Sequence, residues 1–152
     1  MEDGAPLASQ LRLVVLRLSR RLRQQAVGDI TPSQLSALAS IAKHGELSLG
    51  ALASIERIAP PSMTRIAARL EEQGLVLRRS DDADRRVARV EISEAGRAML
   101  EEIRNRRDAY LAVRIQDLSA GEQELLSRAV PLLERLAVES EVVPAEHRDP
   151  SW

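Results

Sequence analysis

Arginine and aspartate side chains between residues 57 and 89 are the ones best suited to chemistry, and that chemistry is the binding of phosphates and base edges. Residues 57–89 hold eight arginines against five acidic residues, a local charge of +3. Residues 90–152 hold eight arginines against thirteen acidic residues, a local charge of −5. Guanidinium groups bind phosphates and read guanine in the major groove. The charge pattern therefore indicates a surface for nucleic acid, and the alternative is an uneven patch on an arginine-rich chain.

The same sequence offers little for catalysis. It contains no cysteine, which excludes disulfides, thiolate metal sites and thiol chemistry. It has no Ser/His/Asp arrangement in a supporting context, no glycine-rich phosphate loop and no metal-ligand spacing. Asp81, Asp82 and Asp84 resemble a Mg²⁺ cluster only superficially, because neighbouring arginines compensate them. We therefore expect no enzyme activity, no cofactor and no metal.

Two short helices joined by a tight turn are predicted in the first part of this region. Ser48 is placed to cap the first helix, whose apolar positions include Leu49 and Leu52. Pro60 and Pro61 fit only the first turn of a helix, where a missing N–H costs nothing, so they fix the start of the second. Gly74 supplies the left-handed residue that ends it.

The second of these helices has two distinct faces. Met63, Ile66, Ala67 and Leu70 recur at spacings of three and four and predict a packed face. The candidates that face a nucleic acid are Pro61, Ser62, Thr64, Arg65 and Arg69. Arg65 is the best candidate for a bidentate guanine contact, and Arg69 for a phosphate contact. For Thr64 an inward, packed position is the alternative.

A β-hairpin is predicted to follow, with strands at residues 75–80 and 87–92. The loop between them, Asp81 to Arg86, is too polar to be buried. It presents arginines at the tip of the hairpin. Together, the two helices and the hairpin predict a helix-turn-helix with a basic wing.

At these residues the sequence resembles the MarR family of bacterial transcriptional regulators. The match lies in Leu70…Gly74-Leu75-Val76, in the wing tip Asp84-Arg85-Arg86, and in the strand leading through Ser93 and Gly96 into a long helix. The resemblance covers roughly residues 7–140. It implies that Arg86 enters the DNA minor groove and that Asp84 holds the wing in place. Arg85 is the alternative groove reader.

Helices are also predicted on both sides of this module. Residues 1–6 are expected to be frayed, and residues 7–27 carry an apolar stripe wider than one neighbouring helix needs. This width suggests contact with a second subunit. The arginines beside the stripe are read as a solvated or paired face, against nucleic-acid or membrane-surface binding.

Local signals mark the remaining helices. Thr31 and Gln34 form a capping box around Pro32, opening a helix to about His44, and residues 46–47 are a candidate third strand. Ser93 is placed to cap a long helix. A second capping box at Ser119 opens the last helix, which Pro131 should bend.

The predicted fold class is mainly α with a small β wing: a winged helix-turn-helix domain plus terminal helices that form a dimerisation lobe. The expected division is an N-terminal dimerisation helix at residues 1–30 and a DNA-binding domain at 31–96. C-terminal linker and dimerisation helices should span 97–140, followed by a disordered tail at 141–152.

The expected function is that of a sequence-specific, double-stranded DNA-binding transcriptional regulator, a repressor acting as a homodimer on a pseudo-palindromic operator. Its half-sites should lie roughly 34–36 Å apart. The resemblance also implies release by a small lipophilic or phenolic effector between the two lobes, with Tyr110 as a candidate pocket residue. The alternative is a winged-helix module for protein–protein assembly without specific DNA binding.

Cellular location is read from the absence of membrane and export signals. No apolar run approaches the roughly 20 residues that span a bilayer. The N-terminus also lacks the layout of a secretion signal. A cytoplasmic protein with no membrane partner is expected.

Overall fold

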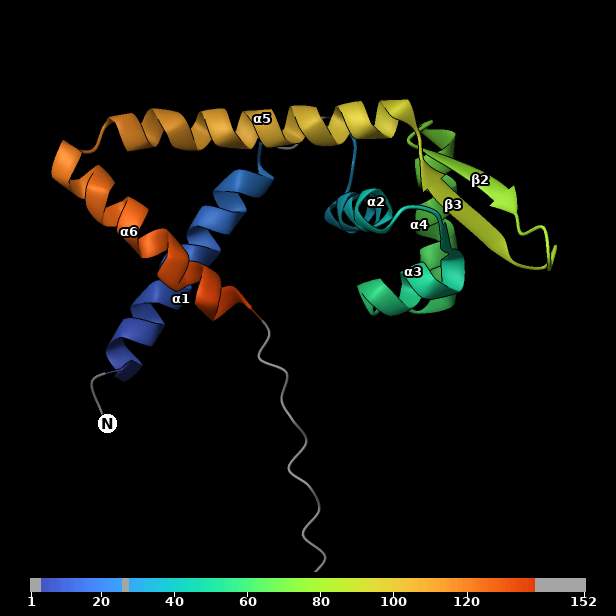
Figure 1. Cartoon of the computed structure of the whole chain (residues 1–152), viewed down its shortest axis with the longest axis horizontal. Coiled ribbons are helices and arrows are strands. Elements are labelled where there is room, and N and C mark those ends of the chain that lie inside the picture. Colours follow the sequence, from blue (N-terminus) through green and yellow to red (C-terminus); the bar gives the residue numbers. More distant parts are fainter. Residues whose placement is uncertain (1–3, 26–27, 139–152) are drawn as a thin grey trace, which may run out of the picture. The chain divides into compact units, whose positions relative to one another are not determined.

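The computed structural model describes residues 4–25 and 28–138, and its helices and strands follow one another as Figure 1 shows. Contacts divide the chain into two units with the boundary between Leu111 and Ala112. The elements are α1 (Gly4–Arg23), α2 (Pro32–His44), β1 (Leu47–Ser48), α3 (Leu49–Glu56), α4 (Pro60–Glu72), β2 (Val76–Ser80), β3 (Ala88–Ile92), α5 (Glu94–Gln116) and α6 (Ala120–Ala137). The predicted mainly helical fold with a small β wing is confirmed.

The predicted helix caps are present as hydrogen bonds. Thr31 Oγ1 accepts from the N–H of Gln34 (3.2 Å), and Gln34 Oε1 accepts from the N–H of Thr31 (2.9 Å). The Ser48 hydroxyl accepts from the N–H of Ala51 (3.1 Å). A capping box also opens α6 at Ser119. These side chains satisfy backbone donors that a helix start leaves without partners, so the starts of α2, α3 and α6 are fixed locally.

A single apolar cluster holds α2, α3, α4 and the sheet together. Its largest fully buried side chains come from every one of these elements and from α5: Leu38, Ile41, Leu52, Met63, Leu70, Val76, Val90 and Ile103. With no phenylalanine in the chain, the cluster is built from aliphatic side chains and Met63. The inward face predicted for α4 is confirmed, because Met63, Ala67 and Leu70 are all fully buried.

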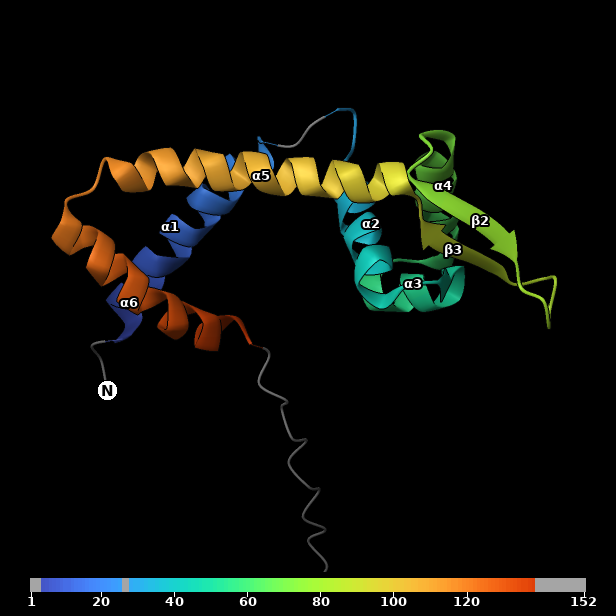
Figure 2. The same cartoon turned by 45° about the horizontal axis from the view of Figure 1, so that its top comes forward.

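The three strands form one antiparallel sheet in the order β1-β3-β2. Val76 pairs with Ile92 and Ser80 with Ala88, which fixes the register of the hairpin. The brief extra strand is confirmed with its bounds shifted by one residue, to Leu47–Ser48, and it pairs with the other edge of β3. Figures 1 and 2 both show the β2–β3 hairpin extending away from the helices α2, α3 and α4.

The base of the hairpin is attached to the start of α5. Ser93 donates its N–H to the carbonyl of Leu75 (3.0 Å) and its hydroxyl to the carbonyl of Gly74 (2.6 Å). The same hydroxyl accepts from the N–H of Gly96 (3.0 Å), so Ser93 caps α5 as predicted. Gly96 packs so closely that a Cβ there would lie 2.2 Å from the Leu75 carbonyl oxygen. The absence of a side chain at residue 96 is therefore a packing requirement.

Both α1 and α6 carry exposed apolar stripes. On α1 the exposed fraction is 65% for Leu7 and 57% for Val14, and on α6 it is 68% for Leu125 and 71% for Leu136. α1 begins at Gly4, so the expected fraying through residue 6 is wrong for residues 4–6; Pro6 is tolerated because it lies in the first turn. α1 ends at Arg23 and residues 24–25 form a turn, so the predicted extent of this helix to about residue 27 is wrong. The predicted tail at 141–152 lies outside the described residues. None of the described helices combines the length and apolar character needed to span a membrane.

Replacing Gly96 with alanine should lower the free energy of unfolding by about 1–3 kcal/mol, the usual cost of overpacking a close contact. Urea denaturation measures the change. Gly50 provides the control, because it lies in α3 and a Cβ there meets nothing within 4 Å. G50A should match or slightly exceed the wild-type stability. Equal stability of G96A and wild type would show that the junction has room to spare.

Candidate nucleic-acid interface

Helix α4 presents the predicted contact residues on the side opposite its buried face. Pro61, Thr64, Arg65 and Arg69 are exposed and Ser62 is half-buried. Thr64 therefore does not pack inward; its hydroxyl donates to the Pro60 carbonyl (3.0 Å). Arg65 reaches the Ser62 hydroxyl at 3.5 Å, and Arg69 forms an ion pair with Glu72 at 2.8 Å.

Opposed charges connect the two strands of the wing. Arg79 lies directly across from Arg89, an arrangement in which like charges repel. Each of them also has an acidic partner, two residues along the chain from the opposite arginine: Arg79 pairs with Glu91, and Arg89 pairs with Asp81. These two ion pairs compensate the repulsion between the opposed arginines. Arg79 and Arg89 are thereby engaged within the wing.

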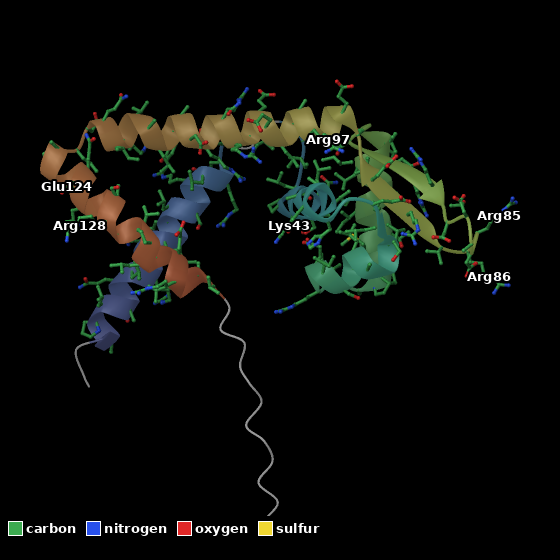
Figure 3. The ribbon with its side chains drawn as sticks, in the orientation of Figure 1. Lys43, Arg85, Arg86, Arg97, Glu124 and Arg128 are labelled. Carbon is green, nitrogen blue, oxygen red and sulfur yellow. The ribbon has the colours of Figure 1, made fainter. Side chains whose placement is uncertain are left out.

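Aspartates organise the wing tip through the backbone. Asp81 Oδ1 accepts from the N–H groups of Ala83 (2.8 Å) and Asp84 (3.0 Å). Asp84 Oδ1 in turn accepts from the N–H of Arg86 (3.0 Å). Such side-chain turns fix the local backbone without help from the core. Figure 3 shows Arg85 and Arg86 at the tip of the wing, with their side chains pointing away from the helices.

Asp81 is the residue whose acidity changes most clearly. The hydrogen bond from Arg89, followed by those from the Asp84 and Ala83 N–H groups, lowers the pKa of Asp81 from 3.8 to about 2. The same partnership raises the pKa of Arg89. Asp81 therefore stays ionised throughout the neutral and mildly acidic range, and it holds Arg89 and the start of the loop together.

Two grooves connect α4 with the wing. One, of about 440 Å³, is lined by Thr64 of α4, by Arg78, Arg86, Val87 and Ala88 of the wing, and by Ser48, Leu49 and Gly50 at the start of α3. The other, of about 330 Å³, is lined by Glu71 of α4 and by the wing residues Arg78, Arg79, Ser80, Arg85, Arg86, Val87 and Ala88. The structure thus places Thr64 of α4 and Arg86 of the wing on one concave surface. The guanidinium groups of Arg78, Arg85 and Arg86 make no ion pair within the part of the chain that the structure describes.

Hydrogen bonds from α2 hold the turn between α3 and α4. Arg57 adopts a left-handed conformation (φ 54°, ψ 41°), which costs a residue with a Cβ roughly 1–2 kcal/mol. Immediately before it, the Glu56 carboxylate accepts hydrogen bonds from Ser36 (2.6 Å) and Ser40, both on α2. The turn that leads into α4 is therefore attached to α2 by polar contacts as well as by the apolar cluster.

The sequence predicts Asp84, Arg85 and Arg86 as site residues, but it gives no role in the site to Arg78, Asp81 and Arg89, which it places in the same hairpin. Arg78 and Arg79 are neighbours on β2 and point to opposite faces of the sheet. Arg78 lies across from Val90 and lines both grooves, whereas Arg79 lines only one of them and pairs with Glu91. For Asp81, a sequence signal exists: an aspartate at the start of a short polar loop commonly accepts hydrogen bonds from the N–H groups two and three residues later. The Asp81–Arg89 pair joins residues eight positions apart and depends on the hairpin register.

Comparison with known proteins identifies the family. The MarR family model matches residues 30–88. A helix-turn-helix transcriptional regulator of Mycobacterium tuberculosis is 40% identical over 141 residues, which are 92% of this chain and 99% of that protein. The transcriptional repressor MdtR of Bacillus subtilis is 30% identical over 134 residues, 85% of each chain. The crystal structure of a transcriptional regulator from Pseudomonas aeruginosa superposes with a TM-score of 0.82 at 33% identity, covering 92% of this chain and 99% of that one.

A helix-turn-helix with an arginine-tipped wing defines the class as a winged-helix DNA-binding protein. Since a relative of 40% identity covers nearly the whole chain, the chain belongs to the MarR family. It is a DNA-binding transcriptional regulator of the helix-turn-helix type.

The depressed pKa of Asp81 predicts an acid-sensitive wing. A carboxylate whose pKa falls on folding adds stability that is fully present above its unfolded pKa, 3.8, and is lost as the pH falls through its folded pKa, about 2. The carboxyl ¹³C shift of Asp81 should titrate with a midpoint near 2. D81N should disturb the amide shifts of Ala83 and Asp84 at neutral pH, whereas D82N should leave them in place. A midpoint at the ordinary value would contradict the pairing with Arg89.

Proposed function

We propose that this regulator acts as a homodimer that reads a pseudo-palindromic operator with α4 in the major groove and the wing along the adjacent backbone and minor groove. The observation that carries the proposal is the shared groove: Thr64 of α4 and Arg86 of the wing line the same concave surface. One duplex can then meet both elements of a protomer at once. Dimers of such modules meet half-sites about one helical turn apart, roughly 34–36 Å.

Each candidate residue is assigned a role from its position. Arg65 is exposed near the start of α4 and reads a guanine, while Arg69, which pairs with Glu72, exchanges that partner for a phosphate. Pro61, Ser62 and Thr64 lie at the N-terminal end of α4 and approach the backbone and base edges. Arg86 enters the minor groove, Asp84 fixes its backbone, and Arg85 contacts phosphate at the wing tip.

We propose that the protein is a repressor and that it acts in the cytoplasm. The support is the relative MdtR, which is named a transcriptional repressor and covers 85% of the chain. A dimer that occupies an operator overlapping a promoter would exclude polymerase. Selection of bound genomic fragments identifies the operator and the neighbouring genes.

The dimer is proposed to form through the terminal helices. In this proposal residues 1–30 and 97–140 make the dimerisation lobe, and residues 31–96 make the DNA-binding domain. The support is the exposed apolar surface of α1 and α6, where Leu7, Leu125 and Leu136 each expose about two thirds of their side chain or more. Burying apolar area contributes about 25 cal/mol per Å². A twofold axis would place each such stripe against its counterpart.

A small effector is proposed to bind between α2 and α5. A cavity of about 410 Å³ there has apolar walls that include Leu35, Leu100 and Ile103 and a polar rim that includes Lys43 and Arg107. A second cavity of about 340 Å³ shares Leu35, Ala39 and Arg107 with it. Ligand cavities are commonly roughly 300–1,000 Å³, and a lipophilic or phenolic acid matches apolar walls with a cationic rim. Tyr110 lines neither cavity. Thermal-shift screening of such acids against the full chain tests this role.

The rival function, protein–protein assembly without specific DNA binding, is distinguished by salt. Neutralising phosphates releases counterions, so true DNA affinity falls steeply as salt rises. An affinity for duplex DNA that stays constant between low and moderate salt would favour the rival.

Arg65 and Arg86 should differ in the way they affect binding. R65A should flatten the preference at one base pair of each half-site, at a cost of about 1–3 kcal/mol. R86A should weaken binding to all duplexes and reduce the slope of log affinity against log salt by about 0.9 per protomer. Electrophoretic shifts on the selected operator and on its point variants measure both. R106A is the control, because Arg106 pairs with Glu102 on α5; a loss equal to that of R86A would refute the assignment.

Charged substitutions in the apolar stripes should separate the subunits. V14D or L125D should weaken dimerisation by more than about tenfold, since each places a charge where apolar burial is expected. Sedimentation velocity should then show a monomer, and operator binding should fall with it. Q10D, which adds the same charge at a polar position of α1, should remain a dimer. A dimer that survives both apolar replacements would place the interface elsewhere.

A further inference from the structure

We propose that Glu56 is the positioning residue of the DNA-reading helix: by accepting hydrogen bonds from Ser36 and Ser40 it sets the orientation in which the turn delivers α4. Glu56 is the last residue of α3, and only residues 57–59 separate it from Pro60, the first residue of α4. Any displacement of Glu56 relative to α2 is therefore passed almost directly to the start of α4.

The geometry is that of a two-point attachment. Ser36 and Ser40 lie one helical turn apart on α2, so their hydroxyls project from the same face. Ser36 donates to Oε2 of Glu56 (2.6 Å) and Ser40 donates to Oε1. One bond would leave the carboxylate free to rotate about the contact, whereas two bonds to its two oxygens fix the plane of the group.

Apolar packing alone does not supply this constraint. The cluster formed by Leu38 and Ile41 of α2 with Met63 and Leu70 of α4 holds the helices together, but apolar attraction is non-directional. Hydrogen bonds to a charged acceptor are directional and stronger than neutral ones. The half-buried Glu56 adds the directional constraint at the end of α4 whose side chains are assigned to the bases.

The turn itself supplies a second reason for such an anchor. Arg57 follows Glu56 in a left-handed conformation, which is unfavourable for any residue with a Cβ and persists only where the surroundings hold it. The N–H of Ile58 returns to the Ala53 carbonyl (3.0 Å), but this bond lies within the α3 end and its turn. The two serine contacts tie that strained turn to α2 by hydrogen bonds.

The same link reaches the proposed effector cavity. Ser36 lines the smaller cavity together with Arg23, Leu35, Ala39 and Arg107, whereas Ser40 lines neither of the two. A change at the cavity wall at Ser36 is therefore separated from the start of α4 by one hydrogen bond and the three residues of the turn. The positioning role itself needs no effector.

The experiment compares specific with non-specific binding in the full chain. E56A and the double variant S36A/S40A should each weaken binding to the selected operator about tenfold, as expected for bonds to a charged acceptor. Binding to a shuffled duplex of the same length should change by less than about twofold, because phosphate attraction tolerates a small rotation of α4. The triple variant should be no weaker than E56A, since the bonds share one acceptor.

Two controls separate positioning from folding. S36T/S40T keeps both hydroxyls and should retain operator affinity, and S54A, which removes a hydroxyl that donates only to the Gly50 carbonyl within α3, should do the same. An increased unfolded fraction lowers both affinities by the same factor. Parallel losses on the two duplexes, or an unchanged operator affinity in E56A, would overturn the proposal. It rests on α4 being the reading helix, and R65A tests that premise separately, because R65A leaves the Glu56 bonds in place.

Discussion

The packing of α4 against α2 decides which side chains of α4 reach solvent. Met63, Ala67 and Leu70 are fully buried in one cluster with Leu38 and Ile41 of α2, and helical periodicity then turns Thr64, Arg65 and Arg69 outward. A rotation of α4 that exposed Met63 would forfeit about 1.5–3 kcal/mol of burial. The apolar face thus decides which side of α4 faces solvent, and the Glu56 hydrogen bonds to α2 set the position of its first turn. The wing depends on the same cluster, because Val76 and Val90 join the hairpin to it.

The wing and the helix pair are held by different means. The wing tip is organised within a few residues, through the Asp81 and Asp84 turns and the Asp81–Arg89 pair, so it keeps its shape at a distance from the core. The turn before α4 depends instead on α2, through Glu56. The backbone around Arg86 is therefore set within the wing tip, whereas the turn that leads to Arg65 is bonded directly to α2. If an effector acts at the α2–α5 cavities, base reading is the part of binding that it would affect first.

Most of the fold follows from local sequence signals, and most of the unexpected contacts do not. The caps at Thr31, Ser48 and Ser119, the prolines that open α4 and the strand alternation all act within four residues, so they can be read directly from the sequence. The Glu56 contacts join residues 16 and 20 positions apart, and no local pattern singles out those partners. The choice between Arg78 and Arg79 depends on register, which is decided by the core face of β2. The roles assigned to the predicted site residues remain predictions.

The number of arginines in the module overstates the charge available to DNA. Of the eight between residues 57 and 89, Arg79 and Arg89 are paired across the wing and Arg69 is paired on α4. Arg78, Arg85 and Arg86 line the grooves between the wing and α4, and Arg65 is exposed on α4. Pairing some arginines internally shapes the surface on which the others are presented. The geometry of a few unpaired guanidinium groups, rather than the sum of charge, is then what distinguishes an operator from other duplexes.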